Sequence, residues 1–287
     1  MFFDPNITTL IRDLLPWAGV FFRIVTELGG EIFLISVLLI AFWTYRKREA
    51  TIITFILIVS IVTNYWLKYA IGNPRPPASY WYGDIEAIDY STPSGHAQNS
   101  GALYSWLGAK VRTWWMILTS VILMFLIGIS RVYLGVHFLG DILLGWAIGI
   151  VIGLAGFYFE AQISDFASRT KTKYWYLLLF SIGFILIALS SILPYPGGEN
   201  FGAYGGLTIG VAVAFPLEKK YVNFDFDVGR PRLAARVIIG LVLVIGVMLG
   251  LSPFLPTSEI WLRALRYFTV VLVGIFLWPL IFKKIRL

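Results

Sequence analysis

The chain has 287 residues, of which 58% are hydrophobic and only 14% are charged; because soluble domains carry about a quarter of charged residues, an ordinary soluble domain is excluded. The formal net charge of +7 could suggest nucleic-acid binding, but its distribution along the chain indicates membrane topology and anionic head groups instead. The sequence has no cysteine, which excludes disulfides, thiolate catalysis and Cys-ligated metals.

The first 28 residues combine apolar and charged side chains. Apolar residues recur at helical spacing with charges between them, which is typical of a helix lying along a membrane surface. We expect residues 1–28 to form an amphipathic helix on the outer surface, with a tenth span as the alternative. We expect no removable signal peptide, because no small-residue cleavage site follows a basic leader. The residues that carry the pattern are Leu10, Leu14, Trp17, Phe21 and Ile24, with Arg12, Asp13 and Arg23 between them.

Nine apolar segments follow this amphipathic stretch. A helix rises about 1.5 Å per residue, so crossing about 30 Å of hydrocarbon takes about 20 apolar residues. The sequence therefore predicts an all-α fold, a polytopic helical membrane bundle with about nine transmembrane helices. The third segment, which starts at Ser94, is the least hydrophobic. The predicted spans are residues 29–46, 51–72, 94–110, 113–130, 138–159, 174–193, 202–217, 234–252 and 259–282.

Basic residues are distributed unevenly among the connections between these segments. Most of the 23 Lys and Arg residues lie in connections that fall on one side of the membrane if nine spans are present. The positive-inside rule then places the N-terminus outside and the C-terminus in the cytoplasm. The basic connections are residues 46–48, 110–112, 169–173, 219–236 and 283–286.

Three polar clusters interrupt the apolar chain, and all three map to the outer side of the predicted topology. The first, KYAIGNPRP, covers residues 68–76 at the end of the second span. The second, PSGH, covers residues 93–96 and opens the third span. The third, SRVYLGVHFLGD, covers residues 130–141 and runs into the fifth span. Both histidines of the protein, His96 and His137, lie in these clusters, a coincidence that packing alone does not explain.

The clusters contain the groups that bind anions. Lys68, Arg75 and Arg131 supply cationic donors, and a guanidinium can hold phosphate oxygens in a bidentate fork. Ser94 and Gly95 begin a helix, where free backbone N–H groups and the helix dipole favour a phosphate. The absence of a side chain at Gly95 lets an anion approach the backbone closely. These residues are therefore candidate phosphate-binding residues.

The histidines suit nucleophilic and acid–base catalysis. His137 and Asp141 are four residues apart, one helical turn, so the carboxylate can hold the imidazole in one tautomer. An Asp-oriented histidine is a plausible nucleophile that forms a covalent intermediate. His96 is then the natural acid for the leaving alcohol and the later base toward water.

The three clusters together resemble the signature K-x6-RP, PSGH and SR-x5-H-x3-D of the type 2 phosphatidic acid phosphatase superfamily, which also includes glucose-6-phosphatase and vanadium haloperoxidases. The resemblance spans roughly residues 29–160, and residues 161–287 form an extension with additional transmembrane helices. Nine spans with the N-terminus outside further resemble the glucose-6-phosphatase and sphingosine-phosphate phosphatase branches. Every motif position is present: Lys68, Arg75, Pro76, Pro93, Ser94, Gly95, His96, Ser130, Arg131, His137 and Asp141.

The resemblance implies a role for each of these residues. His137 becomes a phosphohistidine, Asp141 orients it, and His96 acts as acid and base. It also implies that no metal or other cofactor is needed. The residues implied to bind phosphate are Lys68, Arg75, Ser94, Gly95 and Arg131.

Taken singly, these residues also allow structural interpretations. Lys68 and Arg131 could be snorkelling residues at the ends of spans, and Gly95 could be a helix-packing glycine. Charged groups cost about 2.5–3.5 kcal/mol each at mid-membrane on insertion scales, so their clustering favours function. The acidic loop residues Asp84, Glu86 and Asp89 are interpreted as solvated, with exclusion of anionic competitors or contact with a head group as the alternatives.

The sequence thus predicts a multi-pass membrane enzyme that hydrolyses a lipid phosphate or polyprenyl (pyro)phosphate ester at an extracytoplasmic site. Its partners are the lipid phosphate substrate and the bilayer, without nucleic acid, and its oligomeric state stays open. The same residues would serve a lipid phosphotransferase or a phosphatase for a small soluble ester. A non-catalytic lipid-phosphate transporter or sensor is a further alternative, against which the intact His96, His137 and Asp141 argue.

Overall fold

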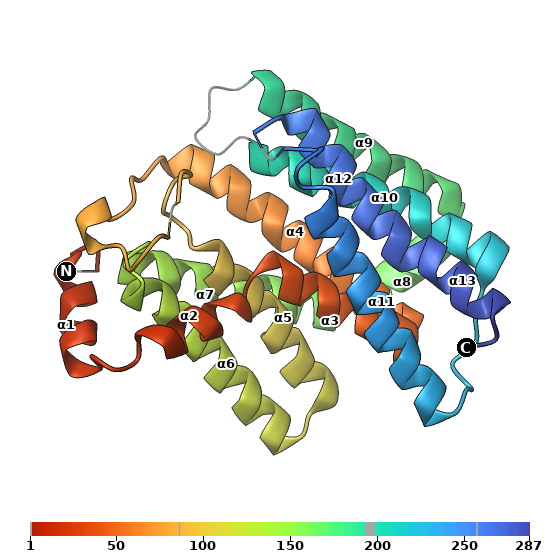
Figure 1. Ribbon diagram of the computed structural model, residues 1–287, viewed down its shortest axis with the longest axis horizontal. Coiled ribbons are helices and arrows are strands. Elements are labelled where there is room, and N and C mark those ends of the chain that lie inside the picture. Colours follow the sequence, from red (N-terminus) through yellow and green to blue (C-terminus); the bar gives the residue numbers. More distant parts are fainter. Residues whose placement is uncertain (1, 86, 193–198, 257) are drawn as a thin grey trace. The chain divides into compact units, whose positions relative to one another are not determined.

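The computed structural model describes residues 2–85, 87–192, 199–256 and 258–287. Within these ranges all regular secondary structure is helical and no strand occurs. The predicted all-α class is therefore confirmed for the part of the chain that the structure describes (Figure 1).

Each of the nine predicted spans coincides with helical structure. Seven helical segments in the described residues are long and apolar enough to cross a membrane, and an eighth is possible if α2 and α3, which meet at a bend of 46°, form one span. Helix α5 has only 17 residues, so nine spans and the orientation of the termini stay predictions. The helices that match the predicted spans are α3 (Glu31–Thr44), α4 (Lys47–Ile71), α5 (Gly95–Val111), α6 (Trp114–Tyr133), α7 (Leu139–Tyr158), α9 (Thr172–Ile192), α10 (Glu199–Leu217), α11 (Arg230–Gly250), and α12 (Ile260–Leu272) continued by α13 (Trp278–Lys284).

The N-terminal segment forms two helices, α1 (Asn6–Leu14) and α2 (Gly19–Glu27), so the expectation of one helix over residues 1–28 is wrong. The physical reason is Pro16, which disfavours the helical conformation of the residue before it and lacks the N–H that a helix requires. The predicted apolar face is nonetheless present. Its members Leu10, Leu14, Trp17, Phe21 and Ile24 are all exposed in the structure, as expected for side chains that face lipid.

The chain divides into two compact units. The first contains residues 1–34 and 52–161, and the second contains residues 35–51 and 162–287. Residues 35–51 thus pack with the second unit, although the sequence analysis groups them with the motif-bearing region.

In the first unit, α5 packs closely against α7 along a row of glycines. A Cβ at Gly149 would lie 2.1 Å from the Gln98 carbonyl oxygen, and one at Gly153 would lie 2.3 Å from the carbonyl oxygen of Ala102. Glycines four residues apart form one face of a helix, and their small size lets two backbones approach. Helix α6 lies against both α5 and α7 (Figure 1). This packing brings the N-termini of α5 and α7 together.

The second unit is also built around a glycine-rich helix. A Cβ at Gly206 of α10 would lie 2.1 Å from the Ala264 carbonyl oxygen of α12, and one at Gly205 would lie 2.6 Å from the Gly183 carbonyl oxygen of α9. The unit further contains most of α8 (Glu160–Arg169), which the sequence analysis did not predict, and the π-helical turns η2 (Glu218–Val222) and η3 (Val273–Leu277).

Candidate active site

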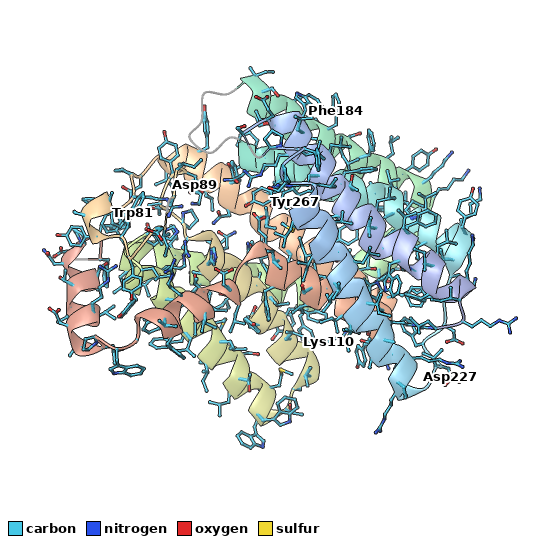
Figure 2. All side chains as sticks on the ribbon, viewed as in Figure 1. Trp81, Asp89, Lys110, Phe184, Asp227 and Tyr267 are labelled. Carbon is cyan, nitrogen blue, oxygen red and sulfur yellow. The ribbon has the colours of Figure 1, made fainter. Side chains whose placement is uncertain are left out.

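The structure brings the three predicted clusters together at one end of the first unit. Lys68 lies in the last turn of α4, and Arg75 lies in the loop that follows. Arg131 lies in the last turn of α6. His137 precedes α7, and Asp141 lies in its first turn. Figure 2 shows Asp89, which contacts this cluster, at the end of the unit opposite Lys110.

His137 and Asp141 form the predicted pair. The His137 Nδ1 atom lies 3.2 Å from Asp141 Oδ2, and both side chains are buried. Asp141 also accepts hydrogen bonds from the Phe138 backbone N–H at 2.8 Å, from the Thr92 hydroxyl at 2.5 Å and from the Ser91 hydroxyl. Because the ionised Asp141 can only accept hydrogen bonds, it favours the His137 tautomer that carries its proton on Nδ1. In this tautomer Nε2 has a free lone pair and can react as a nucleophile.

Arg75 lies against the other side of the His137 ring. Its Nη1 atom is 3.0 Å from His137 Nε2 and donates to the Val136 carbonyl oxygen at 2.7 Å. Burial lowers the pKa of His137 well below its ordinary value, and the positive charges of Arg75 and Lys68 lower it further. Because the imidazole is therefore neutral near pH 7, Nε2 can act as a nucleophile once Arg75 no longer covers it.

The PSGH turn begins α5 beside this pair. The Ser94 backbone N–H donates to the Asp141 carbonyl oxygen at 3.1 Å, and the Ser94 hydroxyl caps the helix by accepting from the Ala97 N–H at 3.5 Å. A Cβ at Gly95 would lie 3.3 Å from Asn64 Oδ1, so a side chain there would press on α4. His96 follows in the first turn and is half-buried.

A buried amide network fixes the PSGH turn to α4. Asn64 Nδ2 donates to the Pro93 carbonyl oxygen at 3.2 Å and to Gln98 Oε1 at 2.9 Å. Gln98 Nε2 in turn donates to the Ser60 carbonyl oxygen at 2.8 Å. Amides with several of their hydrogen bonds satisfied hold two helices in one register, because any shift would leave buried polar groups unpaired.

Among the predicted phosphate-binding cations, Lys68 is buried and Arg131 has an unsatisfied donor. Lys68 is 3% exposed. Arg131 donates from Nη1 to the Thr26 hydroxyl of α2 at 2.8 Å, but its buried Nε has no hydrogen-bond partner among the described residues. A buried donor without a partner costs about 1–3 kcal/mol, and more when it is charged. An anion bound beside Arg131 would satisfy this donor.

Asp89 corrects one expectation of the sequence analysis. The sequence predicts a solvated acidic loop here, but the Asp89 side chain is only 17% exposed and forms ion pairs with Lys68 and Arg75. Buried cations require a counter-charge, which is the physical reason for its position. The expectation holds for Asp84, which is exposed, whereas Glu86 lies outside the described residues.

Sequence reasoning missed four residues of this site: Ser91, Thr92, Thr26 and Asp89. Ser91 and Thr92 directly precede PSGH, so two hydroxyls next to a motif are the signal that could have found them. Thr26 is 105 positions from Arg131, and no local pattern connects them. Among the described residues, no group of three or more His, Asp or Glu side chains could hold a metal ion.

The family is established by comparison with known proteins. Residues 49–165 match the family model of the PAP2 superfamily, and residues 202–287 match that of the transmembrane extension of PAP2 superfamily phosphatases. The chain belongs to the PAP2 superfamily. The predicted resemblance is thereby confirmed, and the protein is a multi-pass membrane phosphatase.

Relatives of this PAP2 protein occur in bacteria, yeast and archaea. It is 29% identical over 174 residues to phosphatidylglycerophosphatase B of Bacillus subtilis, covering 56% of this chain and 83% of the relative. It is 26% identical over 189 residues to dolichyldiphosphatase of Saccharomyces cerevisiae, covering 60% of this chain and 77% of the relative. It is 30% identical over 132 residues to undecaprenyl-diphosphatase of Sulfolobus acidocaldarius, covering 44% of this chain and 62% of the relative. The crystal structure of a PAP2 type phosphatidylglycerolphosphate phosphatase from B. subtilis superposes with a TM-score of 0.48 at 25% identity, covering 55% of this chain and 83% of that one.

Proposed function

We propose that this protein hydrolyses a lipid phosphate or polyprenyl (pyro)phosphate ester at an extracytoplasmic site through a phosphohistidine on His137, without a metal ion. The observation that carries the proposal is the buried His137, whose Nδ1 lies 3.2 Å from Asp141 Oδ2 and whose Nε2 lies 3.0 Å from Arg75 Nη1. The names of the relatives support the substrate class, since they include phosphatases of a phospholipid and of two polyprenyl diphosphates.

In the first step, His137 Nε2 attacks the phosphorus atom and forms a P–N bond while the ester P–O bond breaks. His96 donates a proton to the leaving oxygen, which departs as an alcohol or, from a diphosphate, as a phosphate monoester. Lys68, Arg75 and Arg131 stabilise the negative charge on the phosphoryl oxygens, which supports a reaction without a metal. Asp141 stabilises the imidazolium-like ring of the intermediate.

In the second step, His96 accepts a proton from water, and the oxygen of that water attacks phosphorus. The P–N bond breaks, inorganic phosphate forms, and His137 returns to its neutral form. A lipid hydroxyl in place of water would give a phosphotransferase, and the products separate the two reactions.

Phosphate release by the purified, detergent-solubilised protein tests the proposal. The panel contains phosphatidylglycerophosphate, phosphatidate, polyprenyl phosphate and diphosphate, sphingosine phosphate and glucose-6-phosphate, all with EDTA present. Release that survives EDTA and disappears in His137→Ala is the expected result. From a labelled substrate whose leaving group departs without a proton from His96, the His96→Ala variant should accumulate an acid-labile, alkali-stable phosphoenzyme. Folded protein that releases no phosphate from any substrate would overturn the proposal.

The extracytoplasmic position of the site has its own test. Because the protein contains no cysteine, single cysteines can be introduced at the exposed positions Asp84 and Lys171. We expect an impermeant maleimide added to intact cells to label Asp84→Cys and to label Lys171→Cys only after permeabilisation. The reverse pattern would place the site on the cytoplasmic face.

A further inference from the structure

The donors that are proposed to bind phosphate are already engaged by an acidic side chain of the protein itself. Lys68 Nζ lies 2.9 Å from Asp89 Oδ2, and Arg75 Nη2 donates to Asp89 Oδ1. Backbone oxygens of the same segment complete the arrangement, since Arg75 Nε donates to the Asp89 carbonyl oxygen at 2.8 Å and Lys68 Nζ donates to the Tyr90 carbonyl oxygen. Two carboxylate oxygens thus take the place that two phosphate oxygens would need.

The same contacts hold Arg75 over the nucleophile. With Nε and Nη2 bound to Asp89, the remaining Nη1 lies 3.0 Å from His137 Nε2. A lone pair that accepts a hydrogen bond from a guanidinium is a poor nucleophile. In the structure without substrate, Asp89 therefore occupies the N–H groups that would bind phosphate, and Arg75 at the same time covers the Nε2 atom of His137.

The carboxylate of Asp89 is charged near neutral pH. Burial acts to raise the pKa of Asp89, but the positive charges of Lys68 and Arg75 outweigh it and lower the pKa well below its ordinary value. A phosphate entering the site consequently meets a full negative charge beside Lys68 and Arg75, so anion and carboxylate compete for the same donors.

We propose that Asp89 is an internal competitor of the phosphate group: substrate phosphate displaces its carboxylate from Lys68 and Arg75, and its return displaces inorganic phosphate after hydrolysis. The inference rests on the proposed function, in which Lys68 and Arg75 bind phosphate. It assigns to Asp89 a role in setting the affinity for substrate and product, without contact with the reacting atoms.

The position of Asp89 in the chain permits this movement. The segment is tied by backbone hydrogen bonds on both sides, from the Tyr82 N–H to the Leu134 carbonyl oxygen at 3.0 Å and from the Ser91 N–H to the Asn73 carbonyl oxygen at 2.8 Å. Asp89 lies between these anchors in a loop, so its side chain can turn away while Ser91 keeps its bond to Asp141.

Without the Asp89 carboxylate, the site would release inorganic phosphate slowly after hydrolysis. Lys68 and the Arg75 side chain are positive charges with little exposure that meet at one carboxylate, and such a pair binds phosphate strongly because water screens it little. The returning carboxylate replaces the departing phosphate as counter-charge, so the cations are at no stage left unpaired.

The alternative is a permanent ion pair that orients Lys68 and Arg75 while phosphate binds to their other N–H groups. The two roles predict opposite signs when the charge of Asp89 is removed. A competitor that is removed lets phosphate bind more tightly, whereas an orienting group that is removed lets it bind more weakly.

The experiment measures binding of inorganic phosphate and of vanadate, by calorimetry, to detergent-purified wild-type, Asp89→Asn, Asp89→Glu and Asp84→Asn proteins. We expect Asp89→Asn to lower both dissociation constants about tenfold or more. Asp89→Glu should stay near wild type, because it keeps the charge. Asp84→Asn is the matched control, since it removes the same charge from the same loop at an exposed position. Asp89→Ser replaces Asp89→Asn if the latter does not fold.

The turnover assay supplies an independent readout. With the best substrate of the panel, Asp89→Asn should show a lower KM and stronger inhibition by inorganic phosphate, while Asp84→Asn keeps wild-type values. Unchanged or weaker phosphate binding by Asp89→Asn would overturn the inference.

The proposed phosphate site itself is checked by Arg131→Ala, which should weaken binding. Absence of binding in every variant refutes both the site and the inference, whereas binding that Arg131→Ala weakens and Asp89→Asn does not tighten refutes the inference alone.

Discussion

Arginines in the two units show two ways in which a membrane protein can bury a guanidinium. Arg236 in the second unit is satisfied by the chain itself. It donates to the Leu287 carbonyl oxygen at 3.0 and 2.8 Å and to the Asp225 carbonyl oxygen at 2.8 Å, and it stacks 4.4 Å from the centre of the Phe282 ring. Arg131 in the first unit has one bond, to Thr26, and a buried Nε without a partner in the described residues.

An unpaired Nε alone does not define a functional site. Arg266 in the second unit also has a buried Nε without a described hydrogen-bond partner. The first unit differs because it adds both histidines of the protein and the ion-paired cations Lys68 and Arg75. The comparison teaches that a buried arginine donor without a hydrogen-bond partner indicates a functional site only where reactive side chains lie in the same cluster.

The largest effect is expected for His137→Ala. Loss of the nucleophile removes the covalent pathway, so we expect kcat to fall about ten-thousandfold or more. Phosphate release and phosphoenzyme trapping measure it. A thermal transition close to that of the wild type would show that the loss is chemical. Residual activity within tenfold of wild type would exclude His137 as the nucleophile.

The two arginines should separate activity from stability. Arg131→Ala is expected to lower kcat/KM about a hundredfold or more, because it removes a donor that stabilises charge in the transition state. Arg236→Ala leaves two backbone oxygens unpaired, so it should lower the free energy of unfolding by about 2–4 kcal/mol while kcat of the folded protein is kept. Melting curves and kinetics on the same preparations test both. An inactive but stable Arg236→Ala variant would break the comparison.

The N-terminal helices should contribute to the site through Thr26. Thr26→Val keeps the shape but removes the oxygen that accepts from Arg131, and a hydrogen bond to a charged group is worth about 1.5–3 kcal/mol. We expect kcat/KM to fall about tenfold. Thr26→Ser should restore it, and Thr9→Val, at an exposed position of α1, should have no effect.

A smaller effect concerns the dependence of stability on pH. The pKa of His137 is lowered in the folded protein, so below the ordinary value of 6.5 the unfolded state binds a proton that the folded state does not. Wild type should therefore lose stability relative to His137→Gln as the pH falls below that value, by up to about 1.4 kcal/mol per pH unit. Above pH 6.5 the difference in stability between wild type and His137→Gln should not change with pH. Melting temperatures of both proteins between pH 5 and 8 test this, and a constant difference throughout would contradict the burial of a neutral imidazole.

The sequence predicted what depends on local spacing and composition. Hydropathy and the motifs located the helices of the predicted spans but not α8 or the break between α1 and α2. The separation of His137 from Asp141 by one turn predicted their pairing, which the structure shows. Long-range contacts were not predictable in this way. The bonds from Ser91 and Thr92 to Asp141, and from Arg131 to Thr26, depend on how helices pack, and no residue pattern encodes that. Asp89 was misinterpreted because an acidic loop residue is usually solvated, and only the buried positions of Lys68 and Arg75 reveal its partners.

The amide network between α4 and α5 has a consequence for biosynthesis. With 17 residues and the polar side chains of Gln98, Asn99 and Ser100, α5 is a poor candidate for entering the lipid phase by itself. We expect it to be stable there only when Asn64 donates to the Gln98 side-chain oxygen, the Ser60 carbonyl oxygen accepts from the Gln98 amide, and the glycines of α7 pack against its backbone. If α5 is a span as predicted, we therefore expect it to enter the bilayer only after α7 has been synthesised, so that the catalytic end assembles from α4, α5 and α7 together and not helix by helix.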